Sequence, residues 1–277
     1  MSLGTSMNIR ILLVALIFIF LGGTVKLMGF ILFSSKAVLV DGITCVAAFL
    51  SGLIVIITTR AALKPPDVDH HYGHWRIAYG GPLGILIIYS ASLGVALASM
   101  GFPEPYSVDV RATYSAILGT LLYSIAILIA RLDPIGGSTL AVFGWSEVLE
   151  GLVSAIAAYA GASYSYIIDY FGGILILGYL LVAILRESRD LIFKISDVAE
   201  EGIEERIREE LESRKLKIIS LRVRMLVPGR YAGDATVVAP CNLSLEAANI
   251  IVDEITDFLK RNNIDLTVHI DKDPKCS

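Results

Sequence analysis

The chain has 277 residues, of which 55% are hydrophobic and 18% are charged, and its mean hydropathy is +0.69. These values exclude an ordinary soluble domain and indicate a membrane protein. The formal net charge is −4, and the excess of acidic residues falls after residue 194. No basic surface for nucleic acid is therefore expected.

Six apolar runs are long enough to cross a bilayer, which takes about 20 residues. They cover residues 9–33, 37–62, 79–100, 110–130, 139–160 and 164–185. Lysines and arginines gather at alternate connections, which the positive-inside rule places in the cytoplasm. The pattern predicts six spans in the cell membrane with both termini cytoplasmic. The short turns after residues 33 and 160 make the first two spans antiparallel neighbours, and likewise the last two.

Charged and alternating patterns replace the apolar runs after residue 194. A helical stripe covers 197–213, strand patterns cover 216–227 and 234–239, a second helix covers 244–260, and a last strand covers 264–270. The order αββαβ predicts a two-layer, ferredoxin-like α+β domain. The expected domains are thus a six-span membrane domain, 1–194, and a cytoplasmic domain, 195–277.

One acidic residue lies near the start of the second span. Asp41 is followed by Cys45 at i+4, so the carboxylate and the thiol project from the same helix face. A carboxylate in hydrocarbon costs several kcal/mol unless it is compensated, and a carboxylate beside a thiol suits a divalent metal. The alternative is an Asp that is hydrogen-bonded to a neighbouring helix, with Cys45 as a core residue.

The fifth span supplies a second candidate half-site. Ser146 and Glu150 are separated by four residues and share one helix face, while Glu147 lies partly round the helix. We expect Glu147, which is nearer the cytoplasmic end, to reach water. Glu150 lies deeper and is expected to have a functional role.

The connection between the second and third spans is rich in metal ligands. The stretch KPPDVDHHYGHWR contains three of the four histidines of the chain. Asp67, His70 and His74 supply the oxygen and imidazole ligands that zinc and its neighbours prefer. Gly73 allows a sharp turn through which His70 and His74 can converge. A solvated loop without metal is the alternative.

These motifs resemble the cation diffusion facilitator family, whose members export divalent transition metals from the cytoplasm in exchange for protons. The resemblance covers nearly the whole chain: TVKLMGFILFSSKAVLVDG, PDVDHHYGH in the inside loop, Asp169 opening the sixth span, and a tail that ends in VHID. It implies a homodimer in the lipid bilayer, with metal ions and protons as the transported species, and no enzymatic activity.

The resemblance also implies roles for individual residues. The family's transport quartet falls on Asp41, Cys45, Ser146 and Glu150, where Asp, Asp, His and Asp are usual; Asp41 and Glu150 would couple to protons. The loop site falls on Asp67, His70 and His74. Arg76 takes the place of a basic residue that pairs with an acid after the last span, here Asp197, and a tail site falls on His269 and Asp271.

A mechanism follows from desolvation. Buried carboxylates favour the protonated form, whereas a bound divalent cation favours the ionised form, so metal and proton compete for one site. Alternating access converts that competition into antiport. Family frequency places zinc first as the metal, and manganese, iron, cobalt or cadmium are the other candidates.

Two other classes of function are compatible with parts of the sequence. The altered quartet would also fit a non-transporting dimeric scaffold or metal sensor. An intramembrane metal-dependent hydrolase is disfavoured, because the chain has no H-E-x-x-H motif and no histidine in any span.

Overall fold

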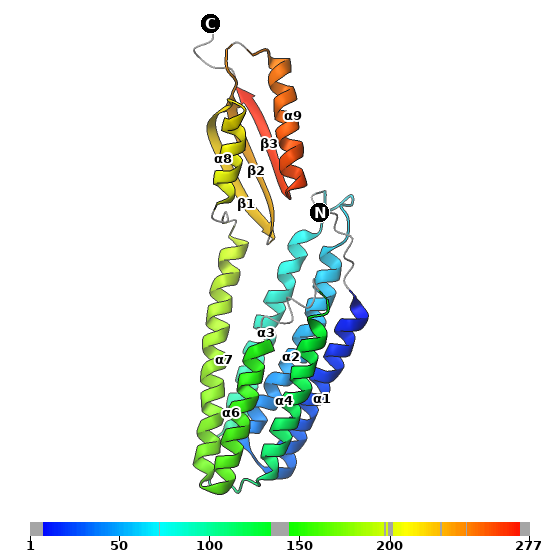
Figure 1. Cartoon of the computed structure of the whole chain (residues 1–277). Coiled ribbons are helices and arrows are strands. Elements are labelled where there is room, and N and C mark those ends of the chain that lie inside the picture. The colour runs from blue at the N-terminus through cyan, green and yellow to red at the C-terminus, as the bar shows by residue number, and fades with distance from the viewer. Residues whose placement is uncertain are drawn as a thin grey trace. The chain divides into compact units, whose positions relative to one another are not determined.

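A computed structural model of the chain describes residues 8–71, 73–133, 144–196, 198, 202–227, 229–241 and 243–271. The chain divides into two compact units, Met1–Arg189 and Asp190–Ser277. The first is a bundle of long helices and the second a small α+β unit (Figure 1). The domain boundary predicted after residue 194 lies a few residues beyond this division and stays a prediction.

Each predicted apolar run contains a long helix in the part that the structure describes. The helices are α1 (Ile9–Phe33), α2 (Lys36–Ala62), α3 (Gly80–Met100), α4 (Arg111–Ala130), α6 (Gly144–Ser163) and α7 (Tyr166–Ile195). A short 3-10 turn, η1 (Trp75–Tyr79), precedes α3. Among the described residues, five helices are long and apolar enough to cross a membrane; α6, which carries two glutamates, is not among them. The start of the predicted run 139–160 lies outside the described residues.

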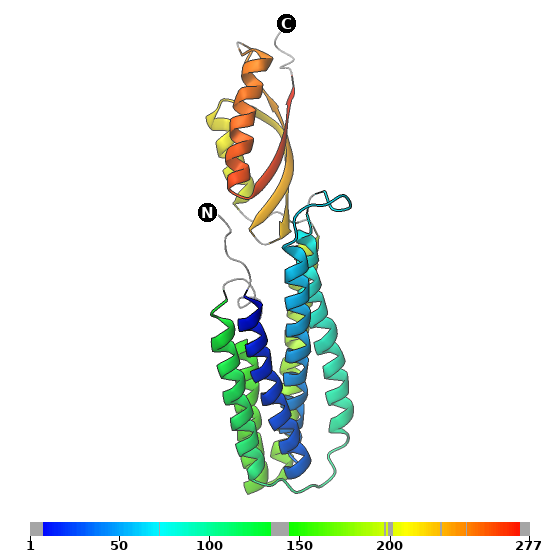
Figure 2. The ribbon, with the colours of Figure 1, turned by 90° about the vertical axis from the view of Figure 1, so that its right-hand side faces the viewer.

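The helices of the bundle lie side by side (Figure 2). Helix α1 packs against α2 and α4, and α2 also packs against α3 and α6. Ile176 and Leu177 of α7 join Val40 of α2 and Met100 of α3 in one buried cluster. The bundle therefore folds back so that the second predicted span contacts the fifth, which is the arrangement that a shared site between them requires.

A network at one end of the bundle fixes the start of α2. Ser35 caps the helix, and its side chain accepts a hydrogen bond from Val38 N. The carboxylate of Asp169, in the first turn of α7, accepts hydrogen bonds from Ser35 Oγ, Lys36 N and Tyr106 Oη at 2.5, 2.7 and 2.8 Å. This buried acid thus joins α2, α7 and the α3–α4 loop.

The second unit has the predicted order αββαβ: α8 (Ile203–Ser213), β1 (Lys217–Val227), β2 (Arg230–Val238), α9 (Leu245–Arg261) and β3 (Ile264–Asp271). The sheet order is β1-β2-β3; β1 and β2 are antiparallel and β2 and β3 parallel. Both helices cover one face of the sheet, where their apolar stripes form the core (Figure 1). Strand β2 begins four residues earlier than predicted, because pairing with β1 continues to the turn at Gly229.

Candidate metal centres

The first candidate centre is a cluster of buried acids between α2 and α6. Asp41 and Cys45 lie one turn apart on α2, and both side chains are fully buried. From α6, Glu147 and Glu150 are 1% and 4% exposed. Three carboxylates and a thiol are therefore enclosed within the apolar bundle, where an unbalanced charge is costly.

A lysine from α1 lies in this cluster. Lys26 is fully buried, and its Nζ lies 2.6 Å from Asp41 Oδ1 and 3.3 Å from Cys45 Sγ. The second oxygen of Asp41, Oδ2, accepts a hydrogen bond from Ser154 Oγ of α6. Both carboxylate oxygens of Asp41 thus have partners within the protein, and one of them is a cation.

Glu147 points into the cluster, and the expectation that it reaches water is wrong. Its Oε1 accepts a hydrogen bond from Tyr89 Oη of α3 at 2.6 Å, and its Oε2 lies 4.0 Å from Cys45 Sγ. The physical reason is the packing of α6 against α2 and α4, which encloses the first turn of α6 as well as its centre. The position of Glu147 near the end of its predicted span was not enough to predict the direction of its side chain.

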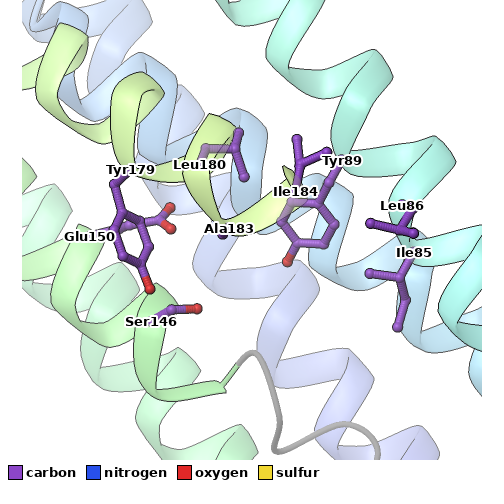
Figure 3. Close-up of a pocket in the computed structure, with 9 residues that line it drawn as sticks. All are labelled: Ile85, Leu86, Tyr89, Ser146, Glu150, Tyr179, Leu180, Ala183 and Ile184. Carbon is purple, nitrogen blue, oxygen red and sulfur yellow. The ribbon is translucent and has the colours of Figure 1, made fainter. Parts of the chain in front are cut away.

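Ser146 and Glu150 line one small pocket, together with Tyr89 and residues of α3 and α7. Figure 3 shows both residues on α6, with Tyr179 of α7 beside them in this view. Within the described part of the chain, Glu150 Oε2 is buried without a hydrogen-bond partner. Glu150 therefore has a carboxylate oxygen without a partner, whereas each oxygen of Asp41 already accepts a hydrogen bond. The membership of Ser146 and Glu150 in one metal site with Asp41 and Cys45 stays a prediction.

The second candidate centre is in the connection between α2 and α3, where the structure brings Asp67, His70 and His74 together. One ligand atom from each lies within 4.8 Å of the others. Asp67 Oδ1 is 3.1 Å from His70 Nδ1, and Asp67 Oδ2 is 3.3 Å from His74 Nε2. Gly73, at φ +85°, provides the turn between the two imidazoles, whose ring centroids are 4.2 Å apart.

The protonation and orientation of these ligands suit metal binding. Slight desolvation acts to raise the pKa of Asp67, but hydrogen bonds from the backbone and ring of His70 outweigh it and lower the pKa below its ordinary value. His74 Nδ1 lies 3.2 Å from Pro65 O, which leaves Nε2 directed at Asp67. His71 is turned away, with its Nε2 2.7 Å from Val68 O.

The remaining predicted residues are the pair Arg76 and Asp197 and the tail residues His269 and Asp271. Asp197 lies outside the described residues, so its expected pair with Arg76 stays a prediction. His269 and Asp271 occupy alternate, exposed positions of β3, opposite Thr236 and Val238 of β2. Where the chain is described, no third metal-ligating side chain joins them.

Comparison with known families identifies both units. Residues 12–195 match the cation efflux transmembrane domain, and residues 195–273 match the cytoplasmic domain of cation efflux proteins. The chain belongs to the cation efflux family. It is an integral membrane protein with the fold that the sequence predicted, a helical bundle followed by a small α+β domain.

A relative of this cation efflux protein is the manganese efflux system protein MneS of Bacillus subtilis. The two are 30% identical over 107 residues, which is 35% of each chain. The match thus spans about a third of the relative's length.

Sequence reasoning missed Lys26 and Ser154 and misjudged Glu147. One signal could have found Lys26: it is the only charged residue between Ile11 and Phe33 in an otherwise apolar run. A lone ammonium in a membrane span requires a counter-charge, and Asp41 is the nearest acid along the chain. No comparable signal singles out Ser154, because a serine in a helix commonly bonds its own backbone.

Proposed function

We propose that this cation efflux protein exports a divalent transition-metal cation from the cytoplasm in exchange for protons. The observation that carries the proposal is the charge balance of the buried cluster. Asp41, Glu147 and Glu150 supply three carboxylates, and Lys26 supplies one ammonium. If all are ionised, two negative charges remain in the bundle, and either a divalent cation or bound protons can neutralise them.

The proposed ligands come from α2 and α6. Three of them, Asp41, Cys45 and Glu150, are the ligands that the sequence predicted, and the fourth, Ser146, lines the same pocket as Glu150. Glu147 is added, because its Oε2 lies 4.0 Å from Cys45 Sγ. Metal and protons would compete for these groups, and alternating access to the two sides of the membrane would couple their movements.

Manganese is the cargo that we favour. Carboxylate and hydroxyl oxygens are the ligands that Mn²⁺ prefers, and they outnumber the single thiol of Cys45 in the cluster. The similarity to a protein named for manganese efflux points the same way. Zinc, the first choice from the sequence, stays a candidate because of Cys45, and iron, cobalt and cadmium complete the panel to be tested.

The setting proposed for this activity is a homodimer in the cell membrane with both termini in the cytoplasm. The basic residues at alternate connections support the orientation. The match of residues 195–273 to the cytoplasmic domain of cation efflux proteins supports a cytoplasmic location for the second unit. The loop site of Asp67, His70 and His74 would then face the cytoplasm and bind metal either before it is transported or independently of transport.

The test is transport by the full chain in proteoliposomes with an imposed pH gradient. Metal entry and proton movement are followed together for manganese, zinc, iron, cobalt and cadmium. We expect metal-dependent proton flux for at least one ion, lost in Asp41→Ala and in Glu150→Ala. Asp109→Ala is the matched control, since that acid is paired with Arg111 outside the cluster. Flux that persists in Asp41→Ala and in Glu150→Ala, or no flux for any ion, would contradict the proposal.

A second candidate function is a non-transporting scaffold or metal sensor. The ion pair between Lys26 and Asp41 favours it, because an ammonium already neutralises the acid that would be the main transport ligand. A sensor would bind metal at Asp67, His70 and His74 without moving it. Metal binding in calorimetry together with a silent proteoliposome assay would identify this function.

A further inference from the structure

Lys26 is a buried cation that enters the transport scheme above only as one charge in the balance of the cluster. It lies in α1 with a fully buried side chain, within a run of apolar residues. Its ammonium contacts Asp41 at 2.6 Å and Cys45 at 3.3 Å. These two residues are the α2 half of the proposed metal site, so the ammonium occupies the place of a bound cation.

The contact between α1 and α4 leaves room for the lysine side chain. Gly119 of α4 lies beside it: a Cβ at this position would be 2.6 Å from Lys26 Cγ and 2.8 Å from Lys26 Cε. Such distances are too short for non-bonded carbons, so any larger residue would displace the lysine stem or separate the helices. The backbone here is thus compatible with Lys26 in this buried position because residue 119 is glycine.

A metal ion and the ammonium compete for Asp41. Oδ2 accepts a hydrogen bond from Ser154, and Oδ1 accepts one from Lys26. A divalent cation on Oδ1 would lie within a few ångströms of Nζ, and two positive charges at that separation repel strongly in a site without bulk water. The ammonium must therefore move away before Asp41 can become a metal ligand.

We propose that the Lys26 ammonium is the resident cation of the Asp41 site, and that a divalent metal cation binds there only by displacing it. The proposal rests on the proposed function for the identity of the ligand. The lysine weakens metal binding, which favours release, and it returns to Asp41 when the metal leaves. The apolar bundle then never contains Asp41 as an unpaired carboxylate.

The test measures metal affinity at this site alone. The full chain in lipid nanodiscs carries His70→Ala and His74→Ala to remove the loop site, and calorimetry with Mn²⁺ and with Zn²⁺ is performed at pH 8, where protons compete least. Lys26→Leu removes the charge without adding a ligand atom, and we expect it to tighten binding by at least about tenfold. Lys26→Arg keeps the charge and is expected to show no gain.

If Lys26 has only a structural role, its removal does not tighten metal binding. If Lys26→Leu elutes as a folded protein and binds metal no more tightly than the parent, the proposal is overturned. Lys26→Gln replaces Lys26→Leu if the leucine variant does not fold. The gain must also disappear in Lys26→Leu/Asp41→Asn, because it is assigned to Asp41; a gain that persists there overturns the proposal as well.

The outcomes separate this proposal from the transport function. If the parent binds and moves no metal but Lys26→Leu binds it at Asp41, the resident-cation proposal stands and the transport function fails. If the parent transports metal and Lys26→Leu shows no gain in affinity, the transport function stands and the resident-cation proposal fails.

Discussion

Asp169 offers the sharpest test of how the bundle is held together. We predict that Asp169→Asn lowers the stability of the membrane domain. The carboxylate accepts hydrogen bonds from Ser35 Oγ on Oδ1, and from Lys36 N and Tyr106 Oη on Oδ2. Asparagine can turn its amide oxygen toward Lys36 N and Tyr106 Oη and its NH₂ toward Ser35 Oγ, so the contacts remain but the acceptor is no longer charged.

The magnitude follows from the loss of charge at the three hydrogen bonds. A hydrogen bond to a charged group contributes about 1.5–3 kcal/mol and a neutral one about 0.5–1.5 kcal/mol. Three bonds weakened by about 1–1.5 kcal/mol each cost roughly 3–4.5 kcal/mol. The carboxylate also lies at the N-terminus of α2, where an anion contributes about 0.3–1 kcal/mol more. The net expectation is a loss of roughly 3–5 kcal/mol.

The assay is thermal unfolding of the purified full chain, followed by size-exclusion chromatography after heating. For a unit of this size, about 2–4 °C of midpoint shift per kcal/mol predicts a decrease of roughly 6–20 °C. Glu104→Gln is the matched control, an exposed acid of the α3–α4 loop, and its midpoint should not change. A midpoint of Asp169→Asn equal to that of the parent would refute the assigned role of the network.

Three further predictions concern single residues. Glu147→Gln should weaken metal binding at the membrane site as strongly as Glu150→Gln, by ~10-fold or more in calorimetry, because both acids are proposed ligands. Full affinity in Glu147→Gln would show that Glu147 is not a ligand. His74→Ala should lower the metal stoichiometry by one ion per chain, whereas His71→Ala should leave it unchanged, because His71 turns away from the cluster. Burial and the neighbouring acid Asp169 raise the pKa of Tyr106. The contribution of Tyr106 to stability is therefore present below the ordinary tyrosine pKa and is lost as the pH rises above it. The stability of Tyr106→Phe should fall less at alkaline pH than that of the parent, and equal pH profiles would contradict this.

The fold followed from the sequence wherever one physical signal dominated. The run 9–33 begins and ends at the same residues as α1, because hydropathy sets its beginning and a tight turn at Ser34 sets its end. The sixth span was predicted to end at residue 185, whereas α7 continues to Ile195. Its final turns carry charged residues, so a hydropathy criterion ends the span before the hydrogen-bonded helix ends.

The candidate site was only partly predictable, because its chemistry depends on contacts between helices. Asp41 and Cys45 were predicted as a pair from their spacing on one helix, and both are buried there. The direction of Glu147 depends on how α6 packs, and its hydrogen bond from Tyr89 joins residues that are 58 positions apart. Lys26 and Asp41 meet because the turn after Phe33 makes α1 and α2 antiparallel neighbours, a contact that the sequence did predict but whose charged pair was overlooked.

The position of Lys26 also gives the altered quartet a physical meaning. A second aspartate at position 45 would place one more negative charge against the ammonium, whereas the Cys45 thiol adds none while it is protonated. With Cys45 neutral, Lys26 and Asp41 form a balanced pair, and in the proposed function Glu147 and Glu150 carry the charge that a divalent cation or protons would neutralise. The proposed transport and sensing functions then differ in one property, whether the ammonium can leave Asp41, and substitution of Lys26 tests that property directly.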